Sequence, residues 1–265
     1  MDSLPVDLTW TEWLLFAVAG VVTGTINTLA GSGSLITLPI FIFIGNLSAP
    51  VANGTNRIGA LLQSFVGINA FRRRGQMPGI VVAWLVVPAI LGGAVGAWLA
   101  SGLDKSQMNN TIAGLMIFML LVLLINPKRW IRETEPDPQK IKHPLTLAAF
   151  FLIGIYGGFI QAGVGIFLLA GLVLVAGFEL KKANAIKLLI VFFFNIPALI
   201  IFFVNHQVSL GMGLAMAIFQ SIGTLIGVWF ASKVPKANVY IHRLLVIIVI
   251  ISAGKFLGLW DYLFA

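Results

Sequence analysis

Long apolar runs, separated by short polar or charged stretches, follow one another along the whole chain. A helix needs about 20 apolar residues to cross the hydrocarbon core of a bilayer, and most of the runs reach that length. The pattern therefore predicts an all-α membrane protein with about ten transmembrane segments. The predicted segments are 12–32, 35–45, 50–71, 78–100, 107–126, 145–162, 164–178, 183–204, 208–231 and 240–260.

Two of these segments, 35–45 and 164–178, are short. Ten residues of helix cover about 15 Å, which is half of the hydrocarbon core. Each short segment follows a glycine-rich break, Gly31-Ser32-Gly33-Ser34 in the first case and Gly163-Val164-Gly165 in the second. We expect short or broken helices here, and the sequence leaves open whether they cross the membrane fully.

The composition agrees with a membrane protein, because 59% of the residues are hydrophobic and only 10% are charged. Soluble domains carry about 25% charged residues. The net charge of +8 does not indicate nucleic-acid binding, since the cations lie in short clusters between apolar runs and form no basic face in water. The chain has no cysteine, which excludes disulfides and thiolate metal sites.

The charges of the loops predict the orientation of the chain. The basic residues gather in alternate loops, and the other loops and both ends are mainly acidic. Cytoplasmic loops carry the excess of Lys and Arg, so we expect a multi-pass protein of the cell inner membrane with both termini in the periplasm. The N-terminus holds no Lys or Arg before the first apolar run, which favours a retained helix over a signal peptide. The basic loop residues are Arg72, Arg73, Arg74, Lys128, Arg129, Arg132, Lys140, Lys142, Lys181, Lys182, Lys233, Lys236 and Arg243.

The chain also contains an internal repeat. The stretch from Gly92 to Ser101 matches the stretch from Gly223 to Ser232, and Asn53 matches Asn184 at the same spacing along the sequence. A chance match between apolar helices is the alternative. Five segments in each half would invert the second copy, as is common in secondary transporters. We expect a first membrane repeat at 1–126, a cytoplasmic linker at 127–144 and a second membrane repeat at 145–265.

Polar residues follow one stripe of the segment 50–71 at helical spacing, among them Asn53, Asn56, Arg57, Gln63 and Ser64. The segment 183–204 has a similar stripe with Asn184, Lys187 and Asn195. Neither segment contains an acidic residue to pair with Arg57 or Lys187. Buried cations without carboxylate partners indicate an anion site. The alternative is that both side chains extend to the membrane surface.

The glycine breaks strengthen this hypothesis, because they place backbone N–H groups at the start of short helices, where anions are favoured. Gly92, Gly93, Gly96, Gly223 and Gly227 are instead expected to let helices pack closely. The candidate substrate-binding residues are Arg57, Lys187, Asn53, Asn56, Gln63, Asn184, Asn195, Ser32, Gly31, Gly33, Ser34, Gln161, Gly163 and Gly165.

We do not expect an enzyme. The three histidines, His143, His206 and His242, show no metal-ligand spacing, and no nucleotide-binding phosphate loop is present. No nucleophile with a base and an orienting group stands out either. The sequence therefore predicts no catalytic residue, no bound metal and no cofactor.

A glycine break, a short helix that ends in glycine and a following polar helix occur in order and return in the second half, and an Arg-Arg-Gly loop follows the polar helix of the first half. These features lie in Gly20–Leu38, Ala52–Gly75 and Pro88–Ser101 and in their counterparts. The pattern resembles the TauE/SafE family of sulfite and organosulfonate exporters, within the 4-toluene sulfonate uptake permease superfamily. The serines of the first break depart from the glycine run that is frequent in the family.

The resemblance implies a secondary transporter that exports small sulfur-containing anions, either sulfite or an organosulfonate. Two cations in related positions suit a ligand with two anionic ends, such as sulfoacetate. The alternatives are an anion channel, an importer of sulfite- or thiosulfate-type anions, and a non-transporting membrane partner. The expected partners are the small anion and the lipid bilayer, with no nucleic acid. Direction, coupling ion and oligomeric state stay open, and a homodimer is one alternative.

Overall fold

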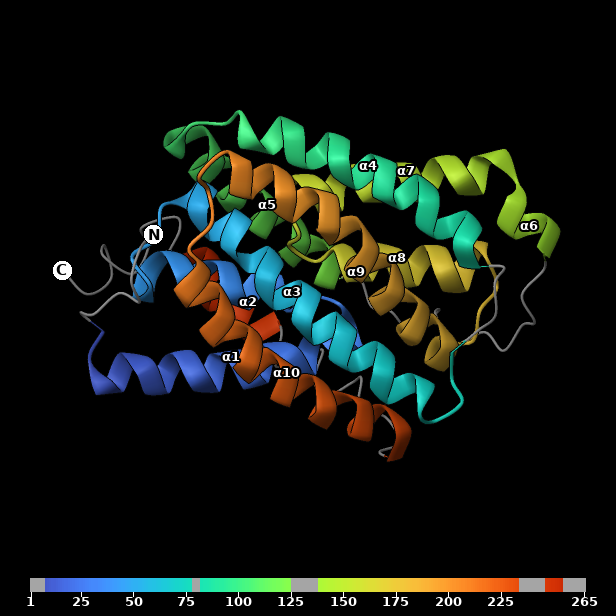
Figure 1. Cartoon of the computed structure of the whole chain (residues 1–265), viewed down its shortest axis with the longest axis horizontal. Coiled ribbons are helices and arrows are strands. Elements are labelled where there is room, and N and C mark those ends of the chain that lie inside the picture. Colours follow the sequence, from blue (N-terminus) through green and yellow to red (C-terminus); the bar gives the residue numbers. More distant parts are fainter. Residues whose placement is uncertain (1–7, 78–81, 125–137, 234–245, 255–265) are drawn as a thin grey trace.

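The computed structural model describes residues 8–77, 82–124, 138–233 and 246–254, and all secondary structure in these residues is helical (Figure 1). The long helices lie roughly alongside one another, along the long axis of the molecule. In chain order they are α1 (Trp10–Ala30), α2 (Ser34–Pro39), η1 (Ile40–Ile44), α3 (Ala49–Arg72), α4 (Ala83–Ser101), α5 (Lys105–Leu124), α6 (Pro138–Lys142), α7 (Pro144–Phe159), α8 (Val164–Ala170), η4 (Gly171–Val175), α9 (Leu180–Val204) and α10 (Leu210–Lys233), followed by helical residues 246–254.

Each predicted segment contains a helix within the described residues. The prediction 145–162 ran too far, because α7 ends at Phe159 and Ile160 adopts extended backbone with φ −146° and ψ 125°. Residues 78–81, 125–126, 240–245 and 255–260 of the predicted segments lie outside the described residues, as do 127–137 of the predicted linker. The division into two repeats stays a prediction.

The distribution of side chains is that of a protein in lipid. Five helices are long and apolar enough to cross a membrane, namely α1, α4, α5, α9 and α10, with spans from Trp10–Ala30 to Leu210–Ala231. The described helices expose large apolar side chains such as Trp98 and Leu152, while they bury polar ones such as Asn53 and Arg57. α3 is 24 residues long but is not among the five, since it carries the polar stripe.

The two short helices that follow the glycine breaks both continue into a π-helical turn. α2 continues directly into the π-helical turn η1, and α8 continues directly into η4. The first π turn ends with Gly45 N donating to Ile40 O at 2.9 Å, and the second with Ala176 N donating to Gly171 O at 2.9 Å. The sequence spacing between the two donors, and between the two acceptors, is the one that separates Asn53 from Asn184. A wider turn of this kind is rare and is frequent at functional sites.

Close helix packing pairs the halves of the chain. α1 packs against α10, and α7 packs against α4. A Cβ on Gly223 would meet Val21 O, and a Cβ on Gly92 would meet Phe151 O. Side chains at these positions would force the helices apart, which confirms the expected packing role. The same holds for Gly93, Gly96 and Gly227.

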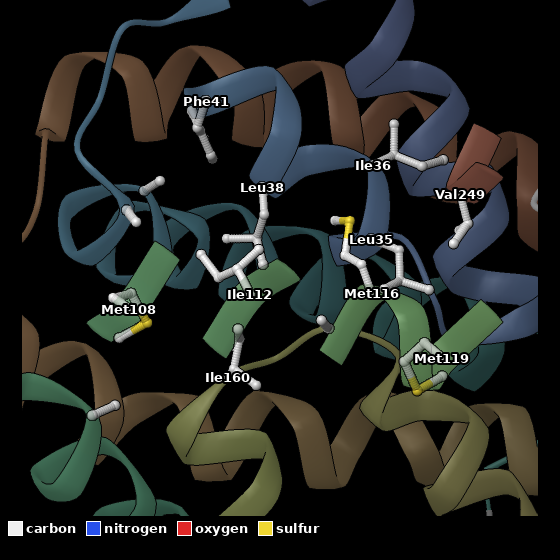
Figure 2. Packing of buried hydrophobic residues seen from close by; sticks show 14 of the residues in the cluster. Leu35, Ile36, Leu38, Phe41, Met108, Ile112, Met116, Met119, Ile160 and Val249 are labelled. Carbon is white, nitrogen blue, oxygen red and sulfur yellow. The ribbon is translucent and has the colours of Figure 1, made fainter. Parts of the chain in front are cut away.

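One face of α5 forms the middle of the largest apolar cluster (Figure 2). Met108, Ile112, Met116 and Met119 lie along α5 at intervals of about one turn and are 0% exposed. Figure 2 shows them beside Leu35 and Leu38 of α2, Ile160 after α7, and Val249. This face of α5, which we call the apolar wall, packs against the short helices α2 and α8 and so supports both glycine breaks.

Candidate functional site

The two glycine breaks meet in the interior of the protein. Gly31 ends α1 with φ +74°, and Gly163 precedes α8 with φ +71°, both in the left-handed region that favours glycine. Gly165 N donates to Gly31 O at 2.9 Å. A Cβ on Gly31 would lie 2.5 Å from Gly165 Cα, so the backbones can approach this closely only with glycine at Gly31.

Gly163 has different surroundings. A Cβ on this residue would lie 3.0 Å from Met119 Sδ, near the flexible end of the methionine side chain on α5. The chain thus brings Gly31 and Gly165 together and places Gly163 against the apolar wall.

Asn56 connects the two breaks. Its Nδ2 donates to Ser34 Oγ at 3.0 Å and to Gln161 Oε1 at 3.3 Å. Ser34 begins α2, while Gln161 lies between α7 and α8. One amide from α3 therefore holds the two halves of the candidate site in register.

Several donors of the breaks are already engaged within the chain. Gly33 N donates to Asn27 Oδ1 at 3.3 Å, and Val164 N donates to Gln161 O at 3.4 Å. Ser32 Oγ donates to Ala30 O at 3.3 Å. An anion that uses these groups would have to replace internal hydrogen bonds. Their predicted role in substrate binding stays a prediction.

Arg57 is fully buried and is bound to the carboxyl end of α7. Its Nη1 donates to Gly157 O and, at 3.3 Å, to Asn195 Oδ1. Its Nη2 donates to Gly158 O at 2.9 Å and to Asn53 Oδ1 at 3.2 Å. The guanidinium carbon lies 5.2 Å from the centre of the Phe202 ring. Arg57 Nε has no hydrogen-bond partner in the described part of the chain.

Lys187 is 1% exposed and makes the corresponding contact with α1. Its Nζ donates to Asn27 O at 2.8 Å, to Thr28 O at 2.9 Å and to Asn184 Oδ1 at 3.1 Å. An ammonium group has three protons, and these three acceptors match them. The alternative that Arg57 and Lys187 extend to the membrane surface is wrong, because both end inside the protein.

The two cations form a crossed arrangement. Arg57 of α3 binds the last turn of α7, and Lys187 of α9 binds the last turn of α1. Helix carboxyl ends carry partial negative charge and carbonyls with spare acceptor capacity, which both cations use; Asn27 O also accepts from Gly31 N at 3.0 Å. Neither cation has a carboxylate partner among the described residues, whose one ion pair joins Lys182 and Glu179 at 4.0 Å.

The accepting carbonyls also occupy related places in the sequence. They belong to Asn27 and Thr28 in one helix and to Gly157 and Gly158 in the other. The spacing between the two pairs is nearly the spacing between Asn53 and Asn184. Each half of the chain therefore supplies both a cation and a pair of acceptors for the cation of the other half.

Three other predicted residues, Asn53, Asn195 and Gln63, are also buried in the interior. Asn53 also donates its Nδ2 to Phe159 O at 2.9 Å, and Asn195 donates its Nδ2 to Val191 O at 2.7 Å. Gln63 is buried, and its Oε1 has no partner within the described residues. Arg57 and Lys187 share no hydrogen-bond partner among the described residues, so they belong to two separate hydrogen-bonded groups.

Sequence reasoning missed the acceptors of the two cations. Backbone carbonyls leave no trace in a pattern of side chains, although the pairs Asn27-Thr28 and Gly157-Gly158 both lie shortly before a glycine break. It also missed Thr23, Gln220 and Thr224, which are 1% exposed on α1 and α10. Isolated polar residues in otherwise apolar spans were the available signal.

An apolar exterior and a hydrogen-bonded polar interior define a multi-pass helical membrane protein. The family model described as "Sulfite exporter TauE/SafE" matches residues 16–256. The chain belongs to this family, which confirms the resemblance based on the glycine breaks and the Arg-Arg-Gly loop.

Curated relatives cover nearly the whole chain. The probable membrane transporter protein ORF9 of Sinorhizobium sp. is 28% identical over 252 residues, which are 95% of each chain. The probable membrane transporter protein YfcA of Escherichia coli K12 is 27% identical over 92% of this chain and 88% of its own. A probable membrane transporter protein of Haemophilus influenzae is 25% identical over 91% of this chain and 92% of its own. No solved structure matches the chain.

Proposed function

We propose that this chain is a secondary transporter that exports small sulfur-containing oxyanions, such as sulfite or an organosulfonate like sulfoacetate, across the inner membrane. The family and the names of the relatives support transport. The observation that carries the proposed substrate class is the pair of buried cations, Arg57 and Lys187, without a carboxylate partner among the described residues.

The proposed site lies around the meeting point of the breaks. The two cations give this region a positive potential, although their protons are largely bound to helix ends. Charges act over several ångströms in a region of low dielectric constant, so an anion need not touch the ammonium group to be stabilised. Asn56, Ser34 and Gln161 supply neutral hydrogen-bonding groups between the cations. The remaining predicted residues surround them.

The proposed architecture is two inverted halves of five segments, with both termini in the periplasm. The matching π turns and the matching cation contacts support an internal repeat, and the loop charges support the orientation. Reporter fusions after Arg74 and at the C-terminus should report opposite sides of the membrane. Reporters that both indicate the cytoplasm would contradict this arrangement.

Binding of the anion is the direct test. Calorimetry on the purified chain should detect sulfite or sulfoacetate, and affinity should fall at least about tenfold in Arg57→Gln and in Lys187→Gln, or about 1.4 kcal/mol. Because both residues hold helix ends, the unfolding midpoint of each variant must be measured beside its affinity. Lys182→Gln is the matched control, since Lys182 is an exposed cation on the same helix as Lys187. Folded variants that bind like the parent would disprove the site.

Transport itself can be tested in vesicles that contain the purified chain. A transporter that alternates between two conformations gives a flux that saturates with the concentration of sulfoacetate. Large currents through single molecules would indicate a channel instead.

A further inference from the structure

Four buried oxygen atoms near the Lys187 end of the site have no hydrogen-bond partner in the part of the chain that the structure describes. They belong to side chains of α1, α3 and α10 that are at most 3% exposed. We call this group the neutral cluster. Its atoms are Thr23 Oγ1, Gln63 Oε1, Gln220 Oε1 and Thr224 Oγ1.

Contacts between α3 and α10 bring three of these residues together. A Cβ on Gly59 would touch Gln220 Oε1, and a Cβ on Gly67 would lie 3.1 Å from Thr224 Cγ2. Gly59, Gln63 and Gly67 follow one another at four-residue spacing on one face of α3. Gln63 therefore lies between Gln220 and Thr224.

A chain of contacts connects the same place to Thr23 and to the first break. Thr23 Cγ2 lies 2.8 Å from the position of a Cβ on Gly33. Thr37 Oγ1 donates to Gly33 O at 3.2 Å and accepts from Gln220 Nε2 at 3.2 Å. The neutral cluster thus begins beside the first glycine break, which follows α1, and extends along α10.

Lys187 adjoins this cluster. Its amine is bound to Thr28 O, and Thr28 Cβ lies 2.8 Å from the position of a Cβ on Gly227, which is about one turn beyond Thr224. A ligand within the cluster would therefore experience the positive charge of Lys187.

The counterparts of the four cluster residues in the other half are apolar, whereas the neighbouring Ser64 corresponds to Asn195, which accepts from Arg57. At the spacing of the internal repeat, or one position from it, Thr23, Gln63, Gln220 and Thr224 correspond to Ile153, Phe194, Ala89 and Gly93. There Phe194 Cβ lies 2.8 Å from the position of a Cβ on Gly93, and Phe194 and Ala89 belong to one apolar core. The same helix packing can thus be built without polar groups, so packing does not explain the neutral cluster.

We propose that the neutral cluster binds the oxyanion head of the substrate directly, next to Lys187; this rests on the proposed function. Buried polar groups without partners destabilise a fold, so they are expected to gain partners in the working protein. Hydroxyl groups rotate to donate, and a sulfite or sulfonate head offers three oxygens as acceptors. Neutral donors hold such a head without adding a second fixed charge, which permits its release.

The Gln220 side chain can present a donor to the cluster in place of Oε1 and still keep a hydrogen bond with Thr37. The Thr37 hydroxyl can donate to Gln220 Oε1 in place of Gly33 O. The amide then turns over and presents Nε2 to the anion. The substrate would thereby also alter a contact of Gly33 at the first break.

The test removes one oxygen at a time. Calorimetry on the full chain with sulfite and with sulfoacetate should show about a tenfold loss of affinity in Thr23→Val and in Thr224→Val. The unfolding midpoint should stay the same or rise, since each change removes a buried oxygen that has no hydrogen-bond partner among the described residues. Thr25→Val is the matched control on α1, because the Thr25 hydroxyl donates to Val21 O and Gly223 O, both at 2.9 Å. It should lower the midpoint and leave affinity unchanged.

The outcomes separate the two proposals. If the parent binds an anion and both cluster variants bind it equally well, the cluster proposal is overturned and the proposed function stands. If the parent binds neither anion, both fail. A loss of stability without a loss of affinity would also overturn the cluster proposal, since it indicates a purely structural role.

A second measurement does not depend on affinity. The chain contains no cysteine, so Thr224→Cys introduces a single thiol. A small methanethiosulfonate reagent should modify it, and sulfoacetate should slow the modification. Ala89→Cys, at the counterpart of Gln220, should not react. An unreactive thiol at position 224 would overturn the proposal.

Discussion

The surroundings of Arg57 and of Lys187 share one arrangement of hydrogen bonds and differ in the side chains that lie beside the cation. Arg57 and Lys187 each bind the last carbonyls of a broken helix from the other half. Beside Arg57 the space is filled by Phe194 and by Phe202, whereas beside Lys187 it holds the neutral cluster. The crossed cations hold helix ends in both groups, and the difference beside them agrees with the proposed ligand site next to Lys187.

The meeting point of the breaks should be the least tolerant position. Gly31→Val places a branched side chain at φ +74° against the backbone of Gly165, and we expect a loss of about 5 kcal/mol in the free energy of unfolding together with all transport. Gly163→Ala should cost less, about 2 kcal/mol, because the flexible Met119 side chain can move. Unfolding in detergent and flux in vesicles measure the two effects. If the two variants lost the same free energy of unfolding, the two breaks would not differ in their tolerance of a side chain.

Phe194 and Gln63 test the contrast between the two ends. Phe194→Ala should cost about 4 kcal/mol, because it leaves a cavity against Gly93 and Gly157. Gln63→Leu should cost less than about 1 kcal/mol, since it removes an oxygen that has no hydrogen-bond partner in the described part of the chain. Denaturant titration of both variants gives the comparison, and a large loss in Gln63→Leu would contradict the assignment of Gln63 to a ligand-binding group.

Replacement of the cations should show a smaller difference. Arg57→Met breaks four hydrogen bonds and leaves two carbonyls in an apolar setting, and we expect a loss of about 3 kcal/mol. Lys187→Met breaks three, for a loss of about 2 kcal/mol. Stability measured without any anion isolates this structural share. If neither variant is destabilised, the crossed contacts do not hold the helix ends.

The smallest effect is expected at the surface. Lys182→Gln breaks an exposed ion pair with Glu179 at 4.0 Å, which should change stability by less than about 0.5 kcal/mol. Thermal unfolding of this variant sets the baseline for a cation on the same helix as Lys187.

Much of the helical layout could be predicted from the sequence, because apolar runs and glycine breaks directly reflect helix length and helix ends. The pairing of the breaks through Asn56 could be expected only in outline, from its place on the polar stripe. The partners of Arg57 and Lys187 could not be predicted, since backbone carbonyls of distant helices accept their protons. The absence of acidic residues suggested unneutralised cations, whereas helix ends supply much of the missing negative charge.

The distance in sequence between Arg57 and its acceptors has a consequence for synthesis. Gly157 and Gly158 lie 100 and 101 residues after Arg57, so α3 leaves the ribosome long before α7 exists. Until then its guanidinium has no carbonyls to bind, and a lone arginine at the centre of a bilayer costs about 3 kcal/mol on insertion scales. Lys187 meets the opposite situation, because Asn27 and Thr28 precede it. Stable insertion of α3 should therefore wait for the second half of the chain, while α9 can enter a membrane that already holds its acceptors.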